Sequence, residues 1–401
     1  MSKNIQEKAD RSRVLKKIKT LMTGSEKSGI LSLGSILSMV AAAYGGMVKL
    51  RASLYKKNIL SSKRLPCFII SIGNLTVGGT GKTPMTIAVA EIVQRLGLKA
   101  AVISRGYKGS LEKTGACVSD GKKLLLDAEI AGDEPFMMAT ALKDIPVVVG
   151  RDRFEAGMIA VKGFRPDVLV LDDAFQHLRL SRDIDLILLD SLQPFGNGHL
   201  LPRGTLREPA SALLRADAIV FTRSNRALDS DGSSLEKKLA IPINKPVFRS
   251  CHTPYIVRFV KAGTNLNHGP SKISDEFDLN FLKRRRVFAF SGIAKNEDFQ
   301  RTLEDLECKP AGFYGYPDHH PYSNRDLDRI YRAARDGNAD LLVTTEKDYV
   351  RIATRVNWPM NLVVLGVRIS FGKDRDAFER FIRDRLNGLI ADSDRLQGGL
   401  L

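Results

Sequence analysis

A glycine-rich stretch, residues 76–83 (TVGGTGKT), has the residue types and spacing that most clearly indicate chemistry. Glycines let the backbone approach a polyphosphate closely, and the N–H groups at the start of a following helix attract negative charge. In such a loop Lys82 would reach the terminal phosphates and the Thr83 hydroxyl would hold a magnesium ion. The spacing departs from the full pattern at one position, where Thr76 stands in place of glycine. The candidate nucleotide-binding residues are Thr76, Val77, Gly78, Gly79, Thr80, Gly81, Lys82 and Thr83.

Two pairs of carboxylates could work with such a loop. Asp172 and Asp173 follow an apolar run, and an acidic strand end of this kind pairs with a phosphate loop to hold magnesium. Solvated strand ends or helix caps are the alternative. Asp133 and Glu134 precede a helix-patterned segment and could cap it. Beside a phosphate site, Asp133 would instead be a candidate base for a substrate hydroxyl.

Two loops add further candidates. Residues 196–209 are too rich in glycine, proline and charge to be core, and loops at strand ends often carry function. The sequence Asp318-His319-His320 resembles a metal-binding pair, but adjacent histidines on a loop point apart and no third ligand is evident. We interpret this motif as orienting or sharing a proton with a carboxylate; the alternative is that it has no catalytic role.

The elements that must position these residues follow from the apolar pattern. Strand-like runs alternate with helix-patterned segments, which predicts a parallel sheet covered on both faces. Ligands in such folds bind at the carboxyl ends of the strands. That edge would gather the phosphate loop, Arg105, Asp133 and the two adjacent aspartates. The expected strands are residues 67–72, 99–104, 145–149, 167–173, 184–189 and 218–222.

The character of the chain changes after this sheet. We predict an α/β fold with a phosphate-loop domain (51–245), a strand-like linker (246–285) and a smaller α/β domain (286–401). An amino-terminal helical segment (1–50) precedes them. In this division Asp133 and His319 lie in different domains, so their contact would form only when the domains close.

The amino end and the net charge indicate the partner. The 401-residue chain carries a net charge of +17, which points to an anionic partner, and its four cysteines lack CxxC spacing. Residues 1–27 hold eight Lys/Arg against three Asp/Glu, and residues 28–48 carry no charge. We favour a pair of helices at a membrane surface, with the basic flank on the cytoplasmic side. A membrane span, a signal peptide and a soluble core helix remain alternatives.

Seven motifs in order carry a family resemblance. The chain resembles tetraacyldisaccharide 4′-kinase, the lipid A 4′-kinase of Gram-negative bacteria, over about residues 31–369. The basic amino-terminal extension and the tail after residue 386 depart from that pattern. The motifs are IGNLTVGGTGKTP, SRGYKG, GDEPFMM, VLDDAFQHLRLSRDIDLILLD, PFGNGHLLPRGTLREP, FYGYPDHHPYS and TTEKD.

The resemblance implies transfer of the ATP γ-phosphate to the 4′-hydroxyl of a tetraacyldisaccharide 1-phosphate. It implies ATP and Mg²⁺ as cofactors, with Asp133 as the base, oriented by a histidine of the Asp-His-His motif, His319 in preference to His320. The enzyme would act at the cytoplasmic face of the inner membrane, on an anionic surface, with no nucleic acid and no obligate protein partner. Lys82 would be catalytic, Thr83, Asp172, Asp173 and Glu208 would serve the metal, and Arg105, Asn197 and Arg207 would contact the substrate.

Two rival functions belong to other classes. A membrane-associated regulatory ATPase of the septum-positioning kind would need a second lysine early in the loop, where Thr76 stands. A nucleic-acid-binding NTPase would account for the charge but not for the apolar run at residues 28–48, and the basic residues 283–286 lack interleaved aromatic residues.

Overall fold

The structure is a computed structural model of the 401-residue chain, and it describes residues 33–226, 244–263, 278–353 and 358–398. The basic helix expected within residues 1–27 lies outside these residues, as does part of the predicted linker, residues 264–277.

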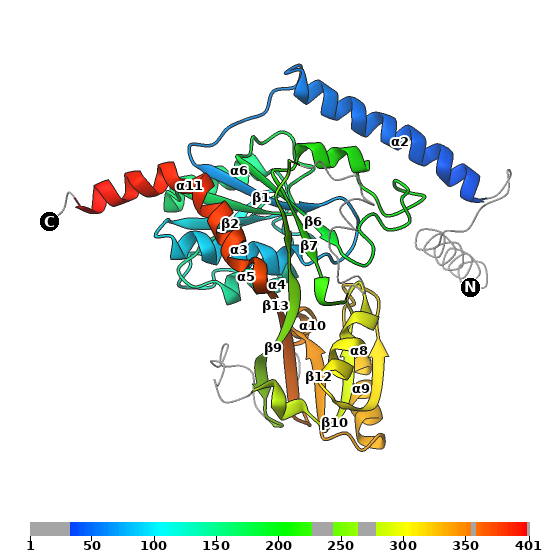
Figure 1. The fold of residues 1–401 in the computed structure, drawn as a ribbon. Coiled ribbons are helices and arrows are strands. Elements are labelled where there is room, and N and C mark those ends of the chain that lie inside the picture. Colours follow the sequence, from blue (N-terminus) through cyan, green and yellow to red (C-terminus); the bar gives the residue numbers. More distant parts are fainter. Residues whose placement is uncertain (1–32, 227–243, 264–277, 354–357, 399–401) are drawn as a thin grey trace. The chain divides into compact units, whose positions relative to one another are not determined.

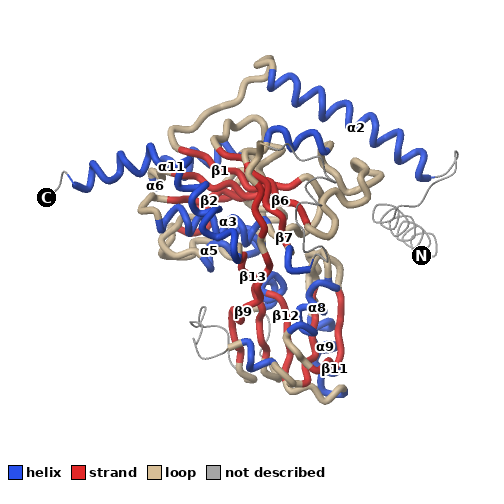
Figure 2. The backbone as a smooth tube through the Cα atoms, in the orientation of Figure 1, coloured by secondary structure: helices blue, strands red, loops and turns tan. Residues whose placement is uncertain are grey.

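The first sheet has eight strands in the order β3-β4-β2-β5-β1-β6-β7-β8 (Figures 1 and 2). The pairs β1/β6, β6/β7, β7/β8 and β2/β4 are parallel, as predicted. The strands β5 and β6 are buried at every position, which explains why both are mostly apolar; Asp185 and Asp190 are the charged residues of β6. The strands are β1 (Phe68–Asn74), β2 (Ala100–Ser104), β3 (Ala116–Ser119), β4 (Val147–Val149), β5 (Val168–Asp172), β6 (Ile184–Asp190), β7 (Ala218–Thr222) and β8 (Val247–Arg249).

The strand β3 corrects the expectation of a purely parallel sheet. It runs antiparallel to β4 at the edge of the sheet. An antiparallel edge strand on an otherwise parallel sheet is common in large α/β folds.

The helices that follow these strands begin where the sequence indicates. The helix α3 (Lys82–Arg95) starts directly after the glycine-rich loop. The helix α6 (Arg153–Phe164) is capped by Asp152, whose carboxylate accepts from the backbone N–H of Phe154. Two shorter helices, α4 (Ala128–Ala131) and α5 (Asp133–Ala141), meet at Gly132, whose φ of 91° favours glycine.

The second sheet has five strands in the order β11-β10-β12-β13-β9, with β13 and the long edge strand β9 side by side (Figure 2). Its core includes Phe290, Tyr322 and Trp358, all nearly inaccessible to solvent. The strands are β9 (Cys251–Val260), β10 (Arg286–Ser291), β11 (Lys309–Gly315), β12 (Leu341–Thr345) and β13 (Leu362–Ser370). The helices are α8 (Asn296–Asp305), α9 (Asn324–Asp336), α10 (Glu346–Ile352) and α11 (Arg375–Gly398).

The chain divides into two compact units, and each is built from separated segments. One comprises Met1–Lys82, Leu171–Cys251 and Phe371–Ile382; the other comprises Thr83–Val170, His252–Ser370 and Arg383–Leu401. The four-part division expected from the sequence stays a prediction. Asp133 and His319 belong to the same unit.

The helix α2 (Leu33–Lys56) contains most of the charge-free run and continues beyond it (Figure 1). Its buried positions are Gly34, Leu37, Ala41 and Gly45. The helix is long and apolar enough to cross a membrane, although core helices and signal sequences also meet that criterion. Only 17% of its apolar window is buried, which argues against a core helix of a soluble protein.

Candidate functional site

The glycine-rich loop connects the end of β1 to the start of α3. Gly78 and Gly81 have φ values of 126° and 84°, which side chains other than glycine rarely adopt. A Cβ at Gly78 or Gly79 would meet no atom of the described chain within 4 Å. The loop therefore presents open space on which a phosphate group could rest.

Residues 205–206 of a second loop hydrogen-bond to the backbone of the glycine-rich loop. The backbone N–H of Val77 donates to the carbonyl of Thr205 at 2.8 Å. Thr76 is buried and forms an antiparallel bridge with Leu206, so its backbone is extended and needs no glycine. This pairing accounts for the one departure from the phosphate-loop pattern.

Side chains hold the loop from its other side. The amide of Asn74 donates to the Thr80 hydroxyl at 2.9 Å. The buried guanidinium of Arg223 donates to the carbonyl of Gly79 at 2.5 Å and pairs with Asp190. These contacts, all made by the chain itself, fix the backbone of the loop.

The acidic strand end lies beside the loop. Asp172 ends β5 and is buried, while Asp173 has a φ of 50° and accepts two hydrogen bonds from Arg207 Nη1, at 2.8 and 2.9 Å. The ammonium of Lys82 lies 3.8 Å from Asp173. Glu208 is buried and accepts from Arg215 at 2.9 Å.

The oxygen donors of this region suit magnesium. In the part of the chain that the structure describes, no group of three or more His, Cys, Asp or Glu side chains is gathered to hold a metal. Magnesium usually binds through one or two carboxylates together with substrate phosphates. Asp172 and Asp173 beside the loop fit such a site, and the metal roles of Thr83 and Glu208 stay predictions.

A second cluster forms around Asp133, the first residue of α5. Its Oδ2 atom lies 2.9 Å from His319 Nδ1 and accepts from Arg351 Nε at 2.9 Å and Nη2 at 2.5 Å. Burial alone would raise the pKa of Asp133, but the hydrogen bonds from His319 and Arg351, together with the positive charge of Arg351, lower it to about 2. The carboxylate is therefore ionised at neutral pH.

The two histidines of the motif have different partners. His319 contacts Asp133, whereas His320 Nε2 lies 3.2 Å from Asp326 and its ring stacks on Tyr316. The family resemblance favoured His319 over His320 as the partner of Asp133, and His319 is the histidine in contact with it. The contact forms within one compact unit, although the sequence placed the two residues in different predicted domains.

Two cations of this cluster were missed by the sequence analysis. Arg351 and Lys347 lie on α10, and the Lys347 ammonium is 3.2 Å from His319 Nε2. Lys347 lies in the TTEKD motif, which carried the family resemblance but no assigned role. Its spacing of four residues from Arg351 was the available signal, because residues so spaced share one side of a helix.

Two predicted substrate residues have structural partners. Arg105 pairs with Glu112 at 2.7 Å and lies over the Tyr107 ring. The Asn197 amide donates to the carbonyl of Arg203 at 3.2 Å. Their contact with a substrate, like that of Arg207, stays a prediction.

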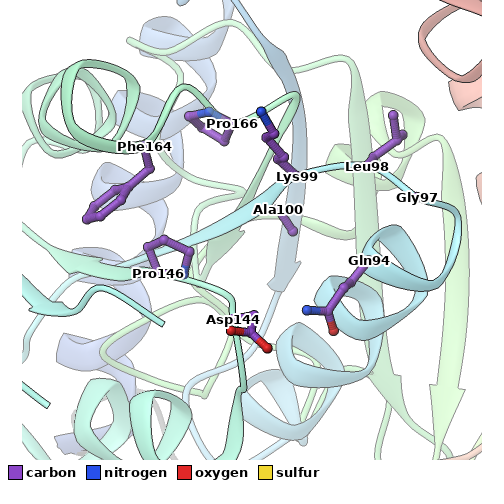
Figure 3. Close-up of a pocket in the computed structure, with 9 residues that line it drawn as sticks. All are labelled: Gln94, Gly97, Leu98, Lys99, Ala100, Asp144, Pro146, Phe164 and Pro166. Atoms are coloured by element: carbon purple, nitrogen blue, oxygen red, sulfur yellow. The ribbon is translucent and has the colours of Figure 1, made fainter. Parts of the chain in front are cut away.

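A shallow pocket lies elsewhere in the first sheet (Figure 3). Ala100 opens β2 and Pro146 precedes β4, so the pocket is at the amino ends of these strands. Ligands of such sheets bind at the carboxyl ends. This pocket therefore has no part in the candidate site.

Comparison with known proteins identifies the family. The profile of the tetraacyldisaccharide-1-P 4′-kinase family matches residues 33–387. The chain belongs to this family. The tetraacyldisaccharide 4′-kinase of Desulfatibacillum aliphaticivorans is 39% identical over 373 residues, which cover 92% of this chain and 98% of that protein. That of Syntrophus aciditrophicus is 38% identical over 358 residues, covering 88% and 92%.

A solved structure agrees with this membership. LpxK from Aquifex aeolicus, crystallised in complex with ATP, is 30% identical with a TM-score of 0.69, covering 88% of this chain and 99% of that one. The family and the α/β fold predicted from the sequence motifs are thereby confirmed. Kinase activity in lipid A biosynthesis, rather than a regulatory ATPase, is the function that this family carries.

Proposed function

We propose that this protein transfers the γ-phosphoryl group of ATP to the 4′-hydroxyl of a tetraacyldisaccharide 1-phosphate. Family membership over residues 33–387 is the observation that carries the proposal. The relative from Aquifex aeolicus was crystallised with ATP, and the glycine-rich loop of this chain, with open space at Gly78 and Gly79, is suited to the same ligand.

On the nucleotide side, the loop would hold the phosphates through backbone N–H groups and the Lys82 ammonium. Lys82 is largely buried, with 12% of its side chain exposed, so its charge would be screened little by water. Magnesium, held with Asp172 and Asp173, would neutralise charge on the phosphates. Arg207 already pairs with Asp173 and would keep that carboxylate oriented.

On the acceptor side, Asp133 is the proposed base. Its Oδ2 atom is used by His319 and Arg351, whereas its Oδ1 atom makes no hydrogen bond with the described residues. Oδ1 could therefore accept the proton of the 4′-hydroxyl. A carboxylate with a pKa of about 2 is a weak base, which suffices where phosphoryl transfer depends on positioning and the proton leaves late.

The exposed side of α2 would lie in the membrane interface. Its exposed apolar residues are Ile36, Met39, Val40, Met47 and Leu50. At about 100° per residue, these positions fall within an arc of about 100°, opposite the buried positions. This stripe, together with the net charge of +17, supports binding to an anionic membrane where the acylated substrate resides.

The cytoplasmic face of the inner membrane is the proposed location, because ATP is available there. An acylated, anionic acceptor accounts for both the basic charge and the apolar stripe. We propose no nucleic-acid partner and no obligate protein partner.

The test is phosphorylation of tetraacyldisaccharide 1-phosphate in mixed micelles by purified protein and labelled ATP. We expect acceptor-dependent transfer, reduced about 10³-fold or more by Lys82→Ala, since charge stabilisation supplies most of this catalysis. Lys122→Ala, at an exposed turn, is the matched control and should retain activity. ATP consumption without acceptor phosphorylation, in protein that melts normally, would refute the proposal.

A further inference from the structure

We propose that Arg351 and Lys347 of α10 are positioning residues for the Asp133–His319 pair. Arg351 fixes the carboxylate through one oxygen, and Lys347 fixes the tautomer of the imidazole. The inference rests on the proposed function, in which Asp133 is the base.

The helix α10 is itself rigidly anchored. Thr345 caps it, and Asp348, which is fully buried, accepts from the Thr345 hydroxyl at 2.6 Å, from Gly292 N–H at 3.0 Å and from Tyr322 O–H at 3.0 Å. The helix cannot shift without breaking these bonds. Side chains that α10 directs toward Asp133 are therefore held in defined positions.

Arg351 contacts the carboxylate in a fork. Its Nε and Nη2 atoms both donate to Asp133 Oδ2, and its Nη1 lies 3.4 Å from Asp348 Oδ1. Only 10% of the Arg351 side chain is exposed, so solvent screens the pair little. Because Nε and Nη2 both donate to Oδ2, Oδ1 stays available to an incoming hydroxyl.

Lys347 defines the protonation of the imidazole. Its ammonium lies 3.2 Å from His319 Nε2, 3.3 Å from Asp318 Oδ1 and 3.4 Å from Glu134 Oε1. An ammonium only donates, so Nε2 accepts and the ring proton is on Nδ1, which donates to Asp133 Oδ2 at 2.9 Å. Arg351 Nη2 lies 3.0 Å from the same Nδ1 because its own N–H is also directed to Asp133 Oδ2. With Nε2 occupied, His319 orients the carboxylate and does not itself take the substrate proton.

The charged surroundings of Asp133 are few, so the effect of Arg351 can be isolated. Among the described residues, these groups face Asp133 or its direct partners: Glu134 on α5, Asp318 and His319 on the loop after β11, and Lys347, Asp348 and Arg351 on α10. The Tyr107 ring lies 5.7 Å from the ring of His319. Removing Arg351 would leave burial, which raises the pKa of Asp133, opposed mainly by the hydrogen bond from His319, so the pKa would rise. The base would then lose its charge at a higher pH.

The first experiment is the pH profile of kcat for Arg351→Met and Arg351→Lys. We expect Arg351→Met to lower kcat about tenfold or more at neutral pH and to move the acidic limb up by about one pH unit or more, with KM for ATP unchanged. Arg351→Lys should return the acidic limb of the pH profile to its wild-type position but should not restore the full kcat. Lysine keeps the positive charge but cannot make the paired hydrogen bonds of the guanidinium. Arg335→Met, an exposed arginine on α9, is the matched control.

An unchanged profile and kcat in Arg351→Met, with active wild-type protein, would overturn the role of Arg351. Absence of lipid phosphorylation by the wild-type protein would instead refute the proposed function.

The second experiment does not depend on activity. The ¹⁵N shifts of labelled histidine, assigned with His319→Gln, should report a proton on Nδ1 of His319 in the wild-type protein and in Lys347→Arg. Lys347→Met should shift the ring toward the other tautomer. Identical shifts in Lys347→Met and the wild type would refute the role of Lys347, whether or not any arginine variant folds.

Discussion

The apolar stripe of α2 predicts how strongly the protein binds membranes, and Met39 and Met47 are the residues to change. They are 73% and 63% exposed and lie about two turns apart on the exposed side of the helix. Replacing both with serine removes apolar area from the stripe while leaving the buried side of α2 intact.

The expected loss follows from these exposures. Complete burial of a methionine side chain contributes about 1.5–3 kcal/mol. Scaled by the exposed fractions, the two side chains together contribute about 2–4 kcal/mol if they insert fully. At 1.4 kcal/mol per factor of ten, the double variant should bind vesicles about 30-fold or more weakly.

Sedimentation with vesicles of phosphatidylethanolamine and phosphatidylglycerol measures this change. At about 1 M salt, where the Debye length is only about 3 Å, the apolar contribution should remain. The matched control is Leu125→Ser with Val367→Ser, which removes exposed apolar side chains outside α2. If 1 M salt releases all of the wild-type protein, or if the Met39/Met47 variant binds as the wild type does, the insertion of α2 is wrong.

Two further predictions concern the base and the sheet. Asp133→Ala should reduce turnover much more than His319→Ala, and the double variant should be scarcely worse than Asp133→Ala, because residues acting as a unit give non-additive losses. A double-mutant cycle at saturating ATP and lipid measures this. Additive losses would show that the two residues act separately. Gly73→Ala should destabilise the fold by about 1–3 kcal/mol in a thermal melt, since its Cβ would lie 2.4 Å from that of Phe175. Gly163→Ala, in α6 with open space around it, should instead stabilise slightly; equal melting temperatures for the two variants would contradict the packing.

The order of motifs along the chain was sufficient to predict the family and the class of fold, and both predictions are confirmed. Strands such as β5 and β6 could be predicted from the sequence because burial on both faces requires mostly apolar residues. The direction of β3 could not, because a short half-buried strand carries no local mark of its pairing.

What the sequence by itself determined was local. The phosphate loop combines flexible glycines, a helix amino terminus and a lysine within eight consecutive residues, so phosphate binding can be predicted from that stretch alone. The charge-free run at residues 28–48 likewise predicted an apolar helix. The tertiary structure determines which side of α2 packs against the rest of the chain. There the Tyr44 hydroxyl donates to the carbonyl of Arg207, and Arg203 donates to the carbonyl of Gly34.

The surroundings of Asp133 were decided by the tertiary structure. His319 is 186 residues away in sequence and Arg351 is 218 residues away, and no local pattern relates them. The order of motifs suggested His319 through resemblance, but Arg351 follows from no motif. Its effect on Asp133 depends on a contact of about 3 Å in a partly buried setting, because charge interactions strengthen steeply at short range and low solvent exposure. Such a contact exists only once β12 and α10 have folded against α5.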